Sequence, residues 1–84
     1  MDTEFDEDVP TAMVYEALDE RANQLVARYV SLHRAADSDE EQAKWWERVI
    51  AVRDIRRQVP AYDREAIIRQ IGLWDDELRQ VPRA

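Results

Sequence analysis

Residues 11–36 read TAMVYEALDERANQLVARYVSLHRAA, and this stretch decides the fold because its apolar side chains recur at alternating spacings of three and four. That period lines up one apolar stripe along a helix. The stripe is also broader than a simple two-stranded coil requires, so we expect this helix to pack on two others. Its members are Tyr15, Leu18, Ala22, Leu25, Tyr29, Leu32 and Ala36, broadened by Val14, Val26 and His33.

Two breaks in the pattern divide the remaining sequence. Residues 36–38 interrupt the first stripe, and the S-x-x-E spacing from Ser38 to Glu41 is typical of a helix start, because the two side chains can satisfy each other's free backbone donors. Pro60 ends the second helix, since the residue before a proline is disfavoured in helical geometry and the ring has no N–H to donate. Asp63 is then a suitable cap for a third helix.

The second and third segments carry apolar stripes of their own. In the second segment the stripe consists of Trp45, Val49, Val52, Ile55 and Val59, and in the third of Ile67, Ile71, Trp74, Leu78 and Val81. The sequence therefore predicts an all-α fold, a small antiparallel three-helix bundle. Its helices are expected at residues 11–36, 39–58 and 63–81.

The charge of the chain is concentrated at its N-terminus. The net charge is −7, and five acids among the first eight residues account for −5 of it, which leaves −2 for the remainder. Such an acidic segment repels phosphate backbones, so nucleic-acid binding is disfavoured, whereas a basic phosphate-binding cleft would attract it. We expect residues 1–8 to form a flexible acidic tail. Its acids are Asp2, Glu4, Asp6, Glu7 and Asp8.

Composition also restricts the cellular setting. The chain has no cysteine and one histidine, so neither a disulfide framework nor a zinc cluster is expected. No apolar run approaches the roughly 18 residues that span a bilayer, and the start does not resemble a signal peptide. These observations favour a soluble, cytoplasmic protein without membrane contacts.

The motifs of common enzymes are absent from the sequence. It contains no glycine-rich phosphate loop, no nucleophile elbow, no H-E-x-x-H and no calcium loop. Asp75, Asp76 and Glu77 form an acidic run, but consecutive helical residues splay around the axis and do not readily converge on one ion. We therefore expect no catalytic residues, no metal site and no cofactor.

Trp46 is the first candidate for partner contact. It directly follows Trp45, and neighbours on a helix point about 100° apart, so Trp46 and Ile50 lie at the edge of the second stripe. They either reach the third helix or are exposed to a partner.

Gly72, the only glycine, shares a flank with Ile68, where a neighbouring helix or a partner side chain could pack against the bare backbone. Internal packing is the more common reason for such a glycine.

The stretch from Trp45 to Leu78 resembles a known family of small proteins. The run WWERVIAVRDIRR, followed by YDREAII and LWDDEL, is similar to proteins encoded beside zeta-type toxin kinases in actinobacteria, the epsilon-like antitoxins. The resemblance covers about two fifths of the chain. It implies a three-helix bundle that holds a P-loop kinase inactive.

The resemblance also implies a mechanism. The toxin would phosphorylate a nucleotide-activated amino sugar, and the N-terminal helix of the antitoxin would occlude its nucleotide site. Carboxylates entering a pocket built for triphosphate would meet its lysine and arginine side chains. By helix position and charge, the contact residues on the outward face would be Met13, Glu16, Glu20 and Asn23, with Asp19 at the margin. Whether a homo-oligomer or a heterotetramer with the toxin forms is left open.

A different class of function fits the same features. The flank with Trp46, Ile50, Ile68 and Gly72 could pair with its own copy, which would make the chain a self-associating helical structural or adaptor module without a toxin partner. The two hypotheses depend on different residues. Inhibition should depend on Glu16 and Glu20, whereas self-association should depend on Trp46.

Overall fold

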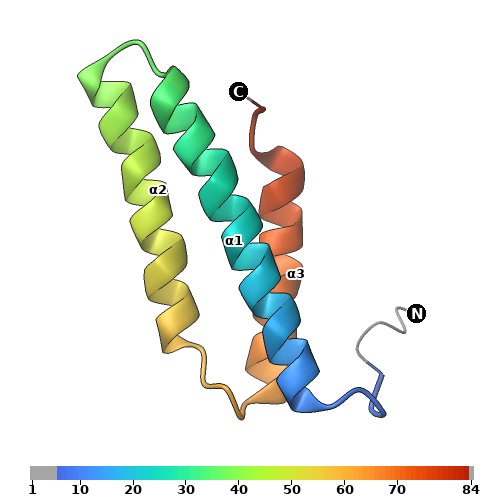
Figure 1. Cartoon of the computed structure of the whole chain (residues 1–84). Coiled ribbons are helices and arrows are strands. Elements are labelled where there is room, and N and C mark those ends of the chain that lie inside the picture. The colour runs from blue at the N-terminus through green and yellow to red at the C-terminus, as the bar shows by residue number, and fades with distance from the viewer. Residues whose placement is uncertain (1–5, 84) are drawn as a thin grey trace.

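Three helices form the computed structural model, which describes residues 6–83 (Figure 1). They are α1 (Thr11–Ala35), α2 (Asp39–Gln58) and α3 (Arg64–Gln80). The predicted all-α fold, a small three-helix bundle, is confirmed. Each helix start and end lies within one residue of its expected position. The one-residue differences arise because Ala36, Asp63 and Val81 are capping residues with non-helical backbone angles.

Side-chain caps explain where α2 and α3 begin. The Ser38 hydroxyl accepts a hydrogen bond from the backbone N–H of Glu41 at 3.1 Å, as the spacing of the two residues predicted. Asp63 acts in the same way on Ala66, also at 3.1 Å. Each cap satisfies a backbone donor that has no partner within the helix, so the two short connections define the helix starts locally.

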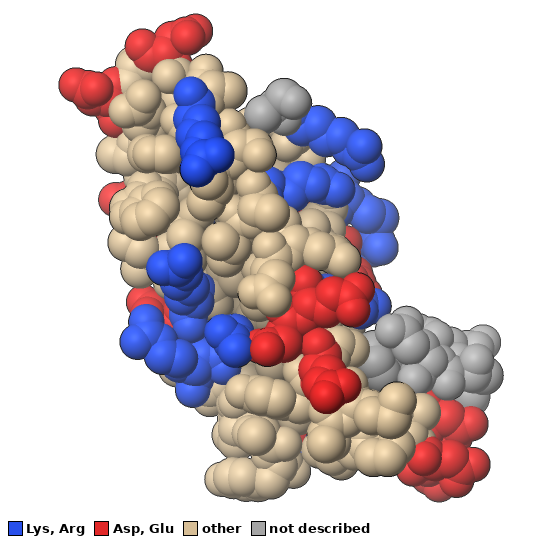
Figure 2. Space-filling model, in the orientation of Figure 1, with Lys and Arg blue, Asp and Glu red and all other residues tan. Residues whose placement is uncertain are grey.

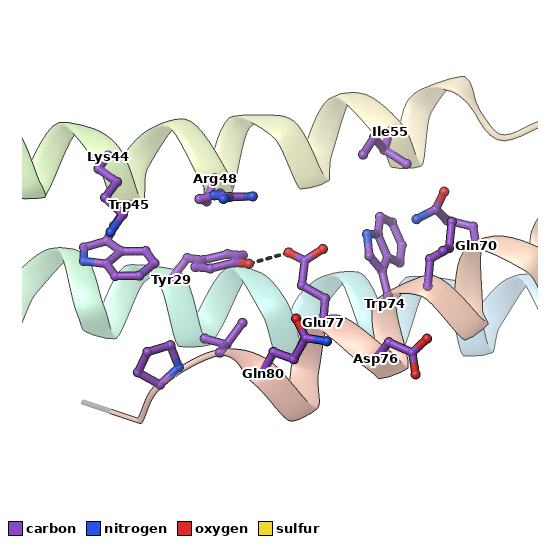
Figure 3. Close-up of a pocket in the computed structure, with 13 residues that line it drawn as sticks. Tyr29, Lys44, Trp45, Arg48, Ile55, Gln70, Trp74, Asp76, Glu77 and Gln80 are labelled. Carbon is purple, nitrogen blue, oxygen red and sulfur yellow. Dashed lines mark hydrogen bonds between the residues drawn. The ribbon is translucent and has the colours of Figure 1, made fainter.

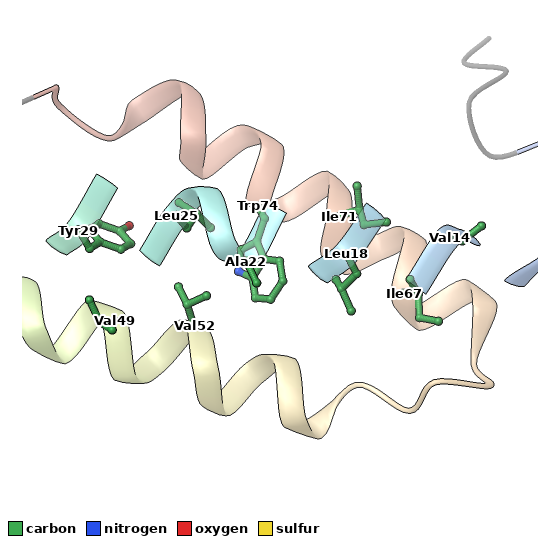
Figure 4. Close-up of a cluster of buried hydrophobic side chains, with 10 residues drawn as sticks. All are labelled: Val14, Leu18, Ala22, Leu25, Tyr29, Val49, Val52, Ile67, Ile71 and Trp74. Atoms are coloured by element: carbon green, nitrogen blue, oxygen red, sulfur yellow. The ribbon is translucent and has the colours of Figure 1, made fainter. Parts of the chain in front are cut away.

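The core follows the predicted stripes (Figure 4). Side chains from both the N-terminal and the C-terminal half of α1 contribute to the core, while α2 supplies only two buried side chains. Trp45 and Ile55, predicted as core residues of α2, are only half-buried. The buried set is Val14, Leu18, Ala22, Leu25, Tyr29, Val49, Val52, Ile67, Ile71 and Trp74.

The arrangement of the helices accounts for this uneven burial. α1 packs against both α2 and α3, but no Cα atom of α2 comes within 8 Å of one in α3. The large side chain of Trp74, only 1% exposed, projects from α3 into the space on the α2 side (Figure 4). α1 is therefore the central helix, and α2 and α3 stand apart on either side of it.

Polar contacts attach both outer helices to α1. Arg21 of α1 pairs with Asp75 of α3 at 3.0 Å, and the guanidinium of Arg28 donates to the backbone carbonyl of Leu78 at 3.2 Å. On the other side, Arg56 of α2 forms an ion pair with Asp19 of α1. These partly exposed contacts fix the orientation of the helices and contribute little stability each, on the order of 0–1 kcal/mol for a surface ion pair.

Residues 6–8 of the expected acidic tail lie in a turn just before α1. The N–H of Val9 donates to the carbonyl of Asp6 at 2.9 Å, which closes a turn. Arg64 of α3 donates to the carbonyls of Asp6 and Val9, both at 2.6 Å. The guanidinium of Arg64 thus holds this turn against α3. The rest of the expected tail, residues 1–5, lies outside the described residues.

Gly72 has no packing role inside the bundle. A Cβ atom placed on it would meet nothing within 4 Å, apart from its own helix backbone and chain neighbours. Its backbone angles are not of the kind that requires glycine. The expectation that internal packing explains Gly72 is therefore wrong, and the residue leaves a bare, exposed stretch of α3.

Candidate functional site

The outer face of α1 brings together most of the predicted contact residues. Met13 is 57% exposed, and Glu16, Glu20 and Asn23 are also exposed. The last three, together with Asp19, line a shallow depression of about 480 Å³. Figure 2 shows acidic side chains gathered over the N-terminal half of α1, beside basic side chains over the C-terminal half of α2. Because α2 and α3 pack on the other sides of α1, this face stays open.

The carboxylates on this face differ in their surroundings. Glu20 accepts a hydrogen bond from Gln24 at 3.3 Å, and neither Glu16 nor Glu20 pairs with a cation within residues 6–83. Asp19 instead turns toward α2, where it pairs with Arg56. It belongs to the contact between the two helices as well as to the rim of the depression. Glu16 and Glu20 are therefore the acids available to a partner.

The structure decides between the two environments that the sequence left open for Trp46 and Ile50. Their side chains are 43% and 45% exposed, so they belong to the surface of the bundle. The Trp46 ring lies 5.5 Å from the ring of His33, whose Nδ1 is 2.9 Å from the carbonyl oxygen of Gln42. Trp46 thus packs on the end of α1 with one side and meets solvent with the other. An exposed indole next to an exposed isoleucine is a typical element of protein interfaces.

The flank proposed for self-association does not come from adjacent helices. Trp46 and Ile50 lie on α2, whereas Ile68 and Gly72 lie on α3, and no Cα atoms of these two helices come within 8 Å of each other. Ile68 is also half-buried against the core. Pairing of copies through these four residues as one patch would have to reach across α1, which lies between the two helices (Figure 1).

A groove between α2 and α3 was not predicted from the sequence. It has a volume of about 620 Å³, and its walls are the two helices that stand apart (Figure 3). Tyr29 of α1 lies on its floor and stacks on Trp45 of α2, with ring centroids 5.9 Å apart and ring planes at 21°. The Lys44 ammonium lies 4.5 Å from the centre of the Trp45 ring, a cation–π geometry. Aromatic side chains therefore form much of this surface.

A hydrogen bond joins the floor of the groove to the α3 wall. The Tyr29 hydroxyl donates to a carboxylate oxygen of Glu77 (Figure 3). Burial, followed by this bond and the charge of the carboxylate, raises the pKa of Tyr29 well above its ordinary value, while Arg48 lowers it slightly. The phenol therefore keeps its proton well above the physiological range and can donate to Glu77 throughout it.

The acidic run at residues 75–77 is divided among three partners. Asp75 pairs with Arg21 at 3.0 Å, Asp76 with Arg79 of its own helix, and Glu77 accepts from Tyr29. The three carboxylates thus point to different sides of α3, as the helical geometry predicted. Within residues 6–83, no group of three or more His, Asp or Glu side chains is placed to hold a metal ion.

Comparisons with known proteins add no relative. No protein-family model, curated protein or solved structure matches this chain. Across the described residues, no helix is both long and apolar enough to cross a bilayer.

Proposed function

We propose that the chain is a protein-binding inhibitor, an antitoxin of the epsilon-like kind, and that the outer face of α1 binds a zeta-type P-loop kinase. One observation carries the proposal. Met13, Glu16, Glu20 and Asn23 are exposed on the one face of the central helix that neither α2 nor α3 covers. The resemblance of residues 45–78 to epsilon-like antitoxins supplies the class of partner.

The chemistry of this face suits a nucleotide site. A P-loop binds phosphates with backbone N–H groups and a lysine, so it offers unpaired donors and positive charge when empty. Glu16 and Glu20 have no cation partner within residues 6–83 and can accept these donors. Met13 adds an apolar contact next to them. A helix placed there excludes the nucleotide by its volume.

Trp46 and Ile50 extend the proposed contact onto α2. Both side chains are nearly half exposed, and the Trp46 ring already contacts His33 at the end of α1. A partner that covers this pair buries an aromatic and an aliphatic side chain, which are frequent anchors of binding free energy. In this proposal the acids of α1 enter the nucleotide site, and the Trp46–Ile50 pair contacts the kinase surface outside it.

The first experiment is an affinity pull-down of the tagged full chain from its native host, followed by mass spectrometry. The proposal expects a P-loop kinase in stoichiometric amount. Recovery of further copies of the chain as the only stoichiometric species would contradict it.

Charge reversal on α1 then tests the binding face. Glu16→Lys combined with Glu20→Lys should weaken inhibition of the recovered kinase by about 100-fold, because two charge-assisted contacts of about 1.5 kcal/mol or more each are lost. Glu40→Lys combined with Glu65→Lys is the matched control, since it makes the same change in charge at exposed positions of α2 and α3 that do not line the depression on α1. Equal inhibition by the two double variants would show that the face of α1 is not the blocking element.

A further inference from the structure

We infer that the groove between α2 and α3 faces the same groove of a second copy of this chain, and that the two copies are related by a two-fold axis that runs along the grooves. The inference does not depend on the proposed kinase inhibition, because none of the exposed contact residues of α1 lines the groove. It rests on two features of the groove, its apolar lining and the distribution of charge between its walls.

The apolar lining comes from side chains that the monomer buries incompletely. Trp45 and Ile55 on the α2 wall and Val81 at the end of the α3 wall are half-buried, and Leu73 on α3 is 56% exposed. The backbones of α2 and α3 do not approach within 8 Å, and these side chains stay partly exposed in the monomer. Contiguous exposed apolar and aromatic surface between two helices is typical of an interface.

The charged residues of the groove are sorted by wall. Both cations that line it, Lys44 and Arg48, lie on α2, and both anions, Asp76 and Glu77, lie on α3 (Figure 3). Neither cation pairs with a carboxylate within residues 6–83. The two walls therefore carry side chains of opposite formal charge. The cations of the α2 wall have unused pairing capacity, whereas on the α3 wall Asp76 already pairs with Arg79 and Glu77 accepts from Tyr29.

This sorting selects one arrangement of two copies. A two-fold axis parallel to the groove exchanges the walls, so the α2 wall of each copy faces the α3 wall of the other, with cations opposite anions. An axis perpendicular to the groove would place α2 against α2, with cations opposite cations, which is unfavourable. The favourable arrangement makes the same complementary contact twice, as a two-fold interface requires.

The charges also favour a second copy over an unrelated helix. An unrelated partner would need an acidic edge and a basic edge separated by the width of this groove, with an apolar stripe between them. The chain itself already has this combination in Arg48, Asp76 and the side chains between the two walls. The groove is thus complementary in charge to the groove of its own copy.

The experiment measures self-association of the full chain by sedimentation velocity from about 10 μM to about 1 mM. The wild type should form a species of twice its 10.0 kDa mass. One variant, Lys44→Glu with Arg48→Glu, reverses the α2 wall, and another, Asp76→Lys with Gln80→Lys, makes the α3 wall positive. Each alone should raise the dimer dissociation constant about ten-fold or more. All four replaced side chains are exposed, so circular dichroism should show an unchanged fold.

An equimolar mixture of the two variants gives the decisive result. The reversed α2 wall of one then faces the positive α3 wall of the other, while the second interface keeps its native charges, so a heterodimer should re-form. The matched control, Arg53→Glu with Arg57→Glu, makes the same change in net charge on α2 outside the groove and should dimerise like the wild type.

Three outcomes would overturn the inference. The first is a wild type that stays monomeric over the whole concentration range. This includes the case in which the groove is covered only in a complex with a kinase, because an unrelated element would then occupy it. The second is a mixture that fails to form heterodimers. The third is a control variant that loses dimerisation to the same degree as the α2-wall variant.

Discussion

Trp74 is the largest fully buried side chain and lies between the two outer helices (Figure 4). It is 1% exposed, and its indole fills space on the α2 side of α3, where the two backbones do not approach within 8 Å. Replacing a buried tryptophan with alanine costs about 3–5 kcal/mol through lost burial and the cavity left behind. We expect Trp74→Ala to lie in this range, because α2 and α3 are each held on α1 and cannot readily collapse into the gap.

That cost is large compared with the stability of a chain of this size. At about 0.05–0.15 kcal/mol per residue, 84 residues correspond to roughly 4–13 kcal/mol of unfolding free energy. Trp74→Ala would therefore remove between about a quarter and all of it. With an m value of about 1 kcal/mol/M, the urea midpoint would fall by about 3 M or more, and a marginal protein would be unfolded without denaturant.

Urea unfolding followed by circular dichroism at 222 nm tests this prediction, since the substitution itself changes tryptophan fluorescence. Trp46→Ala is the matched control. It removes the same side chain at a position that is 43% exposed, and we expect it to cost about 1 kcal/mol or less. If the two variants differ by less than about 0.5 kcal/mol, Trp74 does not bridge the gap between α2 and α3, and the reasoning fails.

Three further predictions concern the pH dependence, a helix cap and the glycine. The raised pKa of Tyr29 means that the folded chain keeps a proton that the unfolded chain loses above about pH 10, so the free energy of unfolding should fall there with rising pH. In urea titrations the difference in unfolding free energy between the wild type and Tyr29→Phe should become smaller above that pH. The control Tyr62→Phe, at an exposed position, should lose stability with rising pH as the wild type does. If the unfolding free energies of the wild type and Tyr29→Phe change with pH in parallel, the assignment is wrong. Ser38→Ala should cost about 0.5–2 kcal/mol in thermal unfolding because it removes the cap of α2, while exposed Ser31→Ala should change little; equal melting temperatures would refute the cap. Gly72→Ala should stabilise the chain by about 0.5–1 kcal/mol, because an added methyl meets no neighbour and helical glycine is unfavourable, and a lower melting temperature would show a close contact there.

The core residues of α1 and α3 could be predicted because their burial follows helical period alone. Leu18, Leu25, Ile67 and Ile71 all lie on predicted stripes and are almost fully buried. The cap at Ser38 could be predicted as well, because it involves residues only three positions apart. Such features depend on local geometry, which the order of residues determines directly.

The candidate site was predicted only in part. The exposure of Glu16 and Glu20 follows from their place opposite the stripe of α1, and the structure places them on one depression. The ion pair of Asp19 with Arg56 could not be predicted, because a position at the margin of a helix face does not reveal which side chain of another helix approaches it. The groove could not be predicted either, because the sequence does not reveal how far apart two helices lie. Trp45, which lines the groove, was predicted only as a member of the buried stripe of α2.

The order of residues by itself determined three helices, their ends and the face that each buries, because the period of apolar side chains, the caps and the proline act within a few residues. Only the tertiary structure decided that α1 is central and that α2 and α3 stand apart with a groove between them. Helical period specifies the direction of a buried face but not the distance between two helices. That distance depends on which large side chains meet between them, and here Trp74 occupies the space that closer backbones would have filled.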